Sequence, residues 1–237
     1  MRIRIGCSGY YYRHWLGLFY PENLPASRWF AFYAKQFDTV EINASFYRFP
    51  SKSAVRRWHR QAPADFTYSV KAPRLITHQK RFHDCGRLLE DLYHVLAGLG
   101  ERLGCILFQL PPGLPFSKEA LTRVLDGMNP GFRNVIEFRH ASWWRQEVYE
   151  ALREKQVGFC SVSAPELPDD LIVTTPDIYL RLHGNPWYAQ SYSEQELAEW
   201  SRRIKDAQAD YAWVYFNNDS NAFAPGNATA FRELLTA

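Results

Sequence analysis

Three residues that carry charge or can titrate interrupt a short apolar stretch in the middle of the chain. Glu137, Arg139 and His140 follow closely on Val135 and Ile136, which are typical of a buried strand. A charge inside such a strand costs several kcal/mol unless it is paired or hydrogen-bonded. A chain that needed only to fold would have no reason to place three such groups here. This stretch therefore predicts a functional site.

Polar residues also end most of the other predicted strands. In barrels of parallel strands the active site lies at the carboxyl ends of the strands. Seven of the eight predicted strands end in groups that can bind a ligand or exchange a proton: Ser8; Glu41 and Asn43; Lys71; Gln109; Glu137 with Arg139 and His140; Arg181 and His183; Asn217 and Asn218. We expect these residues to surround one pocket.

The mixture of residue types favours an anionic ligand. Lys71, Arg139 and Arg181 supply cations, and a pair of guanidinium groups suits a phosphate or a carboxylate. Further contacts are expected from Arg48, His78, His140 and His183. Glu41 and Glu137 are expected to do acid–base chemistry together with His140 and His183. The same carboxylates would also suit a buried ion-pair network, and the sequence leaves both roles open.

The sequence lacks the motifs that are typical of a cofactor-binding or metal-binding site. There is no His-x-Glu or His-x-x-x-His spacing, so we expect no cofactor, although a divalent metal held by Glu41, Glu137 and histidines stays open as an alternative. No Gly-x-Ser-x-Gly context and no Walker-type loop is present, and no cysteine is placed as an obvious nucleophile. Covalent acyl chemistry is not expected.

Aromatic residues follow several of the predicted strands. Aromatic residues of all positions together make up 16% of the chain, which is more than a core of this size needs. Such rings can stack on bases or sugar rings, or they can fold down over the barrel mouth. The residues concerned are Tyr10, Tyr12, Trp15, Phe46, Tyr47, Trp143, Trp187, Tyr188 and Tyr192. We expect Tyr12, Trp15, Tyr47, Trp143 and Tyr192 to contact the substrate.

The elements that must position these groups alternate between strands and helices. Strands are predicted at residues 3–7, 39–42, 66–70, 105–110, 134–138, 158–162, 178–182 and 212–216. Helices are predicted from Ser27 (a plausible N-cap), from Ser51, over 86–99, from Ser117 to Gly127, over 143–155, from Ser193 and over 227–235. Residues 163–175 are rich in proline and acidic side chains and show no helical pattern.

This alternation predicts a single (β/α)8 barrel of the TIM type over residues 1–237. Strands separated by helices pair in parallel. The sequence lacks the dinucleotide-type glycine fingerprint that would favour an open sheet. The sixth helix is expected to be reduced or missing. No linker, repeat or low-complexity segment divides the chain.

Composition restricts the partners. The formal net charge of +3 is too small to indicate a nucleic-acid partner by itself. The four cysteines form no Cys-x-x-Cys pair and are expected to be buried and reduced. The first residues form a strand, and no apolar run reaches the length of a membrane span. We expect a cytoplasmic protein with no membrane association and no protein partner.

The spaced motifs resemble those of the YecE-like family, domain of unknown function 72. They are Gly6-Cys-Ser-Gly9, Tyr12-x-x-Trp15-x-Gly17-x-Phe-Tyr-Pro21, Thr39-Val-Glu41-Ile-Asn43-x-x-Phe-Tyr-Arg48-x-Pro50, Ser69-Val-Lys71, Gln109-Leu-Pro-Pro112, Glu137-Phe-Arg-His-Ala-Ser-Trp143, Arg181-Leu-His-Gly184 and Tyr215-Phe-Asn-Asn218. The resemblance covers residues 3 to 230 and implies a TIM barrel, but no activity. Such barrels are similar in shape to endonuclease IV and the sugar isomerases, whose multi-histidine, multi-carboxylate array is not evident here.

Three functions are consistent with the sequence. The first is an enzyme, a hydrolase or a lyase, acting on a phosphate-bearing substrate such as a nucleotide or a nucleic-acid fragment. The second is a metal-dependent isomerase or lyase of a sugar-like substrate. The third is a non-catalytic nucleic-acid-binding module, for which the small net charge is unfavourable.

Overall fold

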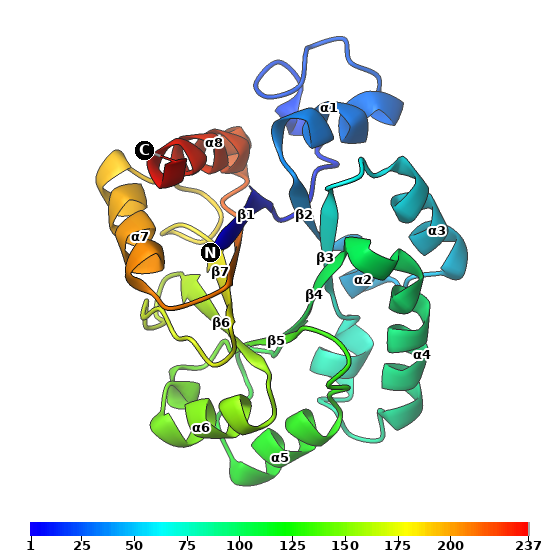
Figure 1. Cartoon of the computed structure of the whole chain (residues 1–237), viewed down its shortest axis with the longest axis vertical. Coiled ribbons are helices and arrows are strands. Elements are labelled where there is room, and N and C mark those ends of the chain that lie inside the picture. Colours follow the sequence, from blue (N-terminus) through cyan, green and yellow to red (C-terminus); the bar gives the residue numbers. More distant parts are fainter. Residues whose placement is uncertain (237) are drawn as a thin grey trace.

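Eight parallel strands form the centre of the molecule in a computed structural model that describes residues 1–236. Figure 1 shows them in a ring, in the order β1-β8-β7-β6-β5-β4-β3-β2. The strands are β1 (Arg2–Cys7), β2 (Thr39–Ile42), β3 (Thr67–Lys71), β4 (Leu103–Gln109), β5 (Asn134–Glu137), β6 (Gly158–Ser163), β7 (Asp177–Leu182) and β8 (Tyr211–Phe216). The predicted parallel barrel is therefore confirmed.

The ring is joined between β1 and β2 at the carboxyl ends of these strands. Ser8 pairs with Glu41 in a single parallel bridge, and Gly9 N donates to Glu41 O at 2.9 Å. Below this bridge the two backbones approach so closely that a Cβ on Gly6 would lie 2.2 Å from Thr39 O. Glycine is thus required at position 6. The bridge places Ser8 and Glu41 side by side at the barrel mouth.

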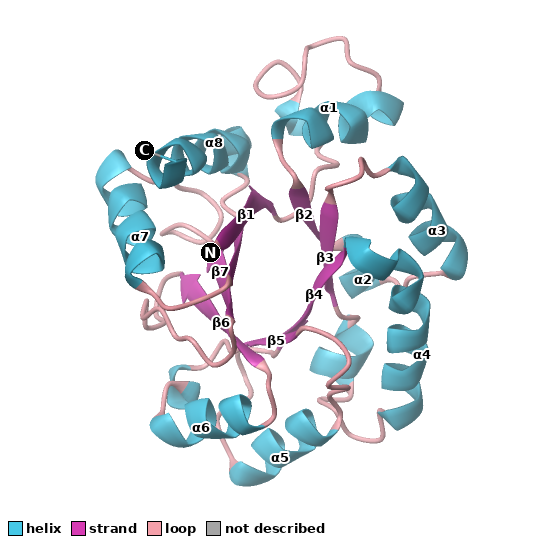
Figure 2. Ribbon diagram, in the orientation of Figure 1, coloured by secondary structure: helices cyan, strands magenta, loops and turns pink. Residues whose placement is uncertain are grey.

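Helices surround the strands on the outside, as Figure 2 shows. They are α1 (Trp29–Gln36), α2 (Ala44–Tyr47), α3 (Lys52–Gln61), α4 (Gly86–Leu96), α5 (Lys118–Asp126), α6 (Gln146–Glu154), α7 (Glu194–Asp206) and α8 (Phe223–Thr236). Short helical turns accompany them: η1 (Arg13–Trp15), η2 (Ala26–Arg28), η3 (Leu75–Gln79), η4 (Ala97–Arg102), η5 (Ala141–Trp143) and η6 (Ser220–Ala222).

Serine caps begin three of the predicted helices. The hydroxyls of Ser51, Ser117 and Ser193 each accept a hydrogen bond from the backbone N–H three residues further on, and Ser193 completes a capping box with Glu196. The expected cap at Ser27 is wrong. Residue 27 lies within η2, and α1 begins at Trp29 without a side-chain cap, because the turn of η2 leads directly into the helix.

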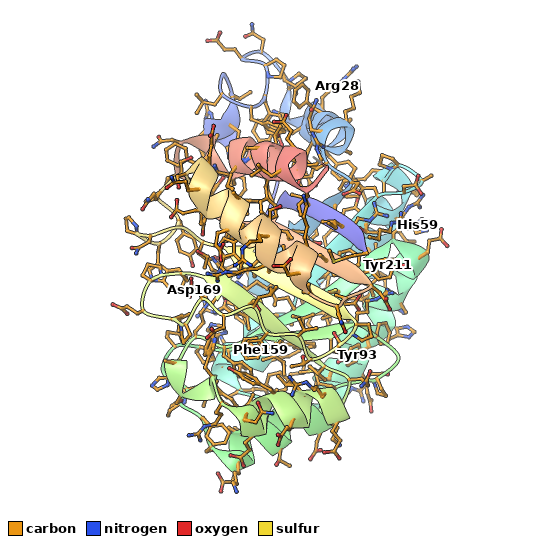
Figure 3. The ribbon with its side chains drawn as sticks, turned by 60° about the vertical axis from the view of Figure 1, so that its left-hand side comes forward. Arg28, His59, Tyr93, Phe159, Asp169 and Tyr211 are labelled. Atoms are coloured by element: carbon orange, nitrogen blue, oxygen red, sulfur yellow. The ribbon has the colours of Figure 1, made fainter. Side chains whose placement is uncertain are left out.

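The segment between β6 and β7 contains no helix, which confirms the prediction for the sixth helical position. Residues 164–176 run as an irregular chain; Figure 3 labels Asp169 within it. Arg203 of α7 holds this segment by donating to the carbonyl of Asp169 at 2.7 Å. Its proline-rich sequence is unsuited to a continuous helix.

Side chains alternate between the inside and the outside of the barrel, as the two-residue period of a strand requires. An inner cluster fills the barrel, made of Cys105, Leu107, Val135, Cys160, Val162, Tyr179, Trp213 and Tyr215. All four cysteines are buried and free. Within residues 1–236, no helix has the length and apolar character needed to cross a membrane.

Candidate functional site

Arg181 of β7 lies at the centre of a buried cluster at the barrel mouth. Its Nη1 donates to Glu137 Oε2 at 2.5 Å, and its Nη2 donates to Glu41 Oε1 at 2.7 Å and to Ser8 Oγ at 2.9 Å. All four side chains are buried. The two carboxylates come from β2 and β5, so one guanidinium joins strands on different sides of the barrel.

Glu137 has two further partners. Arg139 Nε donates to Glu137 Oε1, and His183 Nε2 lies 3.3 Å from the same oxygen. On the other side of the imidazole, Asn217 Nδ2 lies 3.1 Å from His183 Nδ1. Arg139 Nη2 lies 3.2 Å from His183 Nε2, so donor groups face both nitrogens of the ring.

Glu41 is held as completely as Glu137. Tyr179 donates its hydroxyl to Glu41 Oε2 at 2.7 Å, and the Ser8 hydroxyl donates to Glu41 Oε1. Asn43 Nδ2 in turn donates to Ser8 Oγ at 2.8 Å. Both carboxylates thus lie in a network of fixed donors, which is what a buried charge needs.

The network fixes the protonation of its members. Burial would raise the pKa of Glu137, but the guanidinium groups of Arg139 and Arg181 hold that pKa well below its usual range. Burial, then Arg139 and Arg181, lower the pKa of His183 well below its usual range. Near neutral pH, Glu137 is ionised and His183 is neutral. Neither group is therefore suited to exchanging protons there.

Lys71, at the end of β3, has a different environment. Its ammonium lies 4.3 Å from the centroid of the Phe46 ring, and no carboxylate of residues 1–236 forms an ion pair with it. Burial and then the nearby Arg181 lower the pKa of Lys71 to about 7. In its protonated form Lys71 thus lacks a dedicated counter-ion.

A cavity of about 740 Å³ opens over this cluster. It is lined by Tyr12, His14, Leu18, Asn43, Phe46, Tyr47, Lys71, Arg181, Tyr188, Asn217, Asp219, Ser220 and Asn221. Two buried polar atoms of lining residues, Arg181 Nε and Asn43 Oδ1, have no hydrogen-bond partner in the described chain. Orphaned buried groups of this kind indicate a place for a ligand or an ordered water.

Asp219, two residues after Asn217, belongs to this cavity and was not predicted. Its Oδ1 accepts from Trp15 Nε1 at 2.6 Å, and its Oδ2 lies 3.1 Å from His14 Nε2. Burial raises the pKa of Asp219 to about 6. The available signal was its place directly after Asn217 and Asn218, beyond the end of β8. A step of two residues back from Arg181 within β7 would have identified Tyr179.

His78 lies on the short π-helical turn η3 after β3. Its Nδ1 is 2.9 Å from the hydroxyl of Thr77, and its ring meets Phe46 edge to face, with 5.0 Å between centroids. Burial, and then the charge of Lys71, lower the pKa of His78 to about 4. His78 is therefore neutral at neutral pH and close enough to Lys71 for their charges to interact.

Several predicted site residues lie elsewhere, beyond the ends of the strands. His140 Nδ1 is 2.7 Å from Ser142 Oγ and caps η5. Trp143 is fully buried against Phe138, with 4.4 Å between ring centroids, and is a core residue, not a wall of the cavity. Asn218 donates to Gln190 O and to Asn227 Oδ1, so it holds the loops together.

Of the remaining residues predicted to contact the substrate, some line the cavity and others lie away from it. Tyr12 and Tyr47 line the cavity. Trp15 is fully buried and contacts the lining residues Asp219 and Tyr12 from behind. The Tyr192 hydroxyl accepts from Gly184 N, Gln109 Nε2 donates to the neighbouring Leu110 O, and Arg48 is exposed.

No metal cluster is evident in the described part of the chain. Within residues 1–236, no group of three or more histidine, cysteine, aspartate or glutamate side chains could hold a metal ion. Glu41 and Glu137, the carboxylates expected to serve as ligands, are both turned to Arg181.

Comparison with known proteins identifies relatives over the whole chain. The family model described as "Protein of unknown function DUF72" matches residues 4–237. UPF0759 protein YunF of Bacillus subtilis is 26% identical over 91% of this chain and 89% of its own length. UPF0759 protein YecE of Escherichia coli is 32% identical over a shorter region, 47% of this chain and 42% of that protein. The resemblance to the YecE-like family is confirmed.

Solved structures give the same result. A DUF72 family protein from Thermotoga maritima superposes with a TM-score of 0.91 at 29% identity, covering all of both chains. D-psicose 3-epimerase, solved in the presence of D-fructose, superposes over all of both chains with a TM-score of 0.63 at 12% identity. The second likeness concerns the barrel fold alone.

Proposed function

We propose that this chain, which belongs to the DUF72 family, is an enzyme that binds a phosphate-bearing substrate at the carboxyl ends of its strands. One observation carries the proposal. Lys71 brings a positive charge into the cavity, and no carboxylate of the described chain is paired with it. A phosphate group would supply the missing counter-ion.

The charges of the cluster support an anionic ligand. Glu41 and Glu137 are balanced by Arg139 and Arg181, and His183 is neutral. Lys71, when protonated, therefore gives this buried cluster one excess positive charge, while Asp219 on the cavity wall carries a negative charge above its pKa of about 6. The unpaired Arg181 Nε offers an additional donor beneath the cavity. An anion beside a partly buried cation gains more than it would at an open surface.

The geometry assigns the carboxylates a supporting role. Glu137 and Glu41 are fixed as counter-ions that hold Arg181 in place, so they suit positioning better than the acid–base role expected from sequence. Asp219 is the better acid–base group, because it faces the cavity with a pKa of about 6. Lys71 would bind the phosphate, and Asp219 would exchange a proton with the substrate or with an attacking water.

A nucleic-acid-binding module without catalysis is the competing hypothesis. It requires many phosphate contacts and hence an affinity that falls steeply with salt. Lys71 is the only lysine among the residues that line the cavity, so we expect binding of a small phosphate compound with a shallow salt dependence.

Thermal unfolding in the presence of small ligands tests the proposed function. Inorganic phosphate and glycerol 3-phosphate should raise the melting temperature, whereas uncharged glycerol at the same concentration should not. Lys71→Met should abolish the shift. Lys118→Met is the matched control, because Lys118 is a surface lysine with an exposed side chain paired to Glu147. Equal shifts in Lys71→Met and in the wild type would refute the proposal.

A further inference from the structure

A second cavity lies beside the one that contains Lys71. Its volume is about 600 Å³, and it shares the residues Tyr12, Asn43 and Tyr47 with the first cavity. Because the same three side chains line both, the two cavities adjoin along this wall. A ligand that crosses this wall would reach from the neighbourhood of Lys71 into the second cavity.

Exposed apolar side chains gather around this pair of cavities. Six large apolar side chains of the described chain are exposed, and four of them line one or both cavities: Tyr11, Leu18, Tyr47 and Tyr188. Tyr47 is 76% exposed and borders both. Single exposed apolar residues are ordinary, but a cluster of them around a cavity indicates a binding surface.

The second cavity combines flat apolar walls with a few planar polar groups. Phe30 of α1 and Trp58 of α3 are buried beneath it, while Tyr11 stands at its rim. Arg57 and Trp58 of α3 lie four and three residues before Gln61, so each neighbours Gln61 on the helix surface. Arg57 and Gln61 are exposed polar groups, and a hydrocarbon chain has no polar edge to contact them, whereas a nucleobase offers both a stacking face and a polar edge.

We propose that the second cavity binds the base of a nucleoside monophosphate whose phosphate lies beside Lys71. The inference rests on the proposed function for the position of the phosphate, and it adds the chemical class of the substrate. Tyr47 stacks on the base, and Arg57 and Gln61 contact its polar edge. The ribose lies along the shared wall, where Tyr12 and Asn43 line both cavities.

Calorimetric titration with a series of ligands tests this assignment. The series is inorganic phosphate, ribose 5-phosphate, AMP and adenosine. AMP should bind at least roughly tenfold more tightly than ribose 5-phosphate, because the stacking of a base on an aromatic side chain increases affinity by a factor of that order. Tyr47→Ala should remove the gain in affinity of AMP over ribose 5-phosphate, and Tyr47→Phe should restore this gain. Leu75→Ala is the control, since Leu75 is exposed but outside both cavities.

The outcomes separate the two proposals. Equal affinities of AMP and ribose 5-phosphate in the wild type, or an equal loss of both in Tyr47→Ala, would overturn the base site. If phosphate and ribose 5-phosphate still bind in a Lys71-dependent manner, the proposed function survives that result. Binding of adenosine that depends on Tyr47, together with no binding of phosphate or ribose 5-phosphate, would support the base site and contradict the proposed function.

Discussion

Arg181 Nη1 donates to Glu137 Oε2 at 2.5 Å, and both side chains are fully buried inside the barrel. The same guanidinium also contacts Glu41, so a single arginine is paired with two carboxylates from distant strands. Burial would lower the pKa of Arg181, but the carboxylates of Glu137 and Glu41 hold it well above its usual range. The pair is thus a fixed structural unit beneath the cavity, with both charges present at neutral pH.

Glu137→Gln should therefore destabilise the fold. The substitution leaves Arg139 and Arg181 buried with one carboxylate fewer, and breaking a buried pair in this way costs about 3 to 5 kcal/mol. Urea unfolding followed by circular dichroism measures the change. Glu199→Gln is the matched control, because Glu199 pairs with Arg202 and Arg203 on the surface and its loss should matter little. Unchanged stability with lost turnover would instead assign Glu137 to the chemistry.

Lys71 should make the stability of the protein depend on alkaline pH. Its pKa is about 7 in the folded chain and about 10.4 when unfolded, so between these values the unfolded state binds more protons. The free energy of unfolding should therefore gain a rising contribution from pH 7 to about pH 10. This contribution is the difference between the free energies of unfolding of the wild type and of Lys71→Met. Urea unfolding at several pH values measures both. A difference that is constant with pH would show that Lys71 titrates normally.

Asp219 should act in the opposite direction at acid pH. Its pKa is raised to about 6, above the unfolded value of about 3.9, so the folded state binds more protons between the two. Its contribution to stability is complete below about pH 3.9 and is lost as the pH rises through 6. Asp219→Asn should abolish this step while Lys71-dependent phosphate binding persists. Loss of phosphate binding in Asp219→Asn would contradict the separation of binding from proton transfer.

Chelator treatment should leave phosphate binding unchanged. The groups assigned to the anion are the Lys71 ammonium and the Arg181 guanidinium, neither of which can bind a cation. Calorimetry before and after dialysis against EDTA, with metal content measured by mass spectrometry, provides the comparison. A loss of binding that added metal restores would favour the metal-dependent sugar isomerase or lyase instead.

The barrel could be predicted from the sequence because its signals are local. Strand and helix patterns alternate along the chain, and the predicted strand at 39–42 matches β2 at both ends. The missing sixth helix was also visible, in the proline-rich segment after β6. These features depend on short-range periodicity and on turn residues, both of which can be recognised directly in the sequence.

The pairing within the site could not be predicted in the same way. Glu137, Arg139 and His140 are near neighbours in sequence, yet only the first two point into the barrel, since a strand turns successive side chains to opposite faces. Strict use of that period would have excluded His140. The choice of Arg181 as the partner of both carboxylates depends on the barrel's closure, which joins residues 140 positions apart. Trp143 closely follows Glu137, Arg139 and His140 but packs on Phe138, because apolar burial decides its position.

The most direct test of the site is the titration of Lys71. NMR of labelled lysine side chains follows it with and without inorganic phosphate. In the free protein the pKa of Lys71 should be about 7. Phosphate favours the ammonium form, so the pKa should rise when phosphate is bound, and by linkage the affinity for phosphate should fall as the pH rises through 7. A Lys71 pKa that phosphate does not change would show that the anion binds elsewhere or not at all.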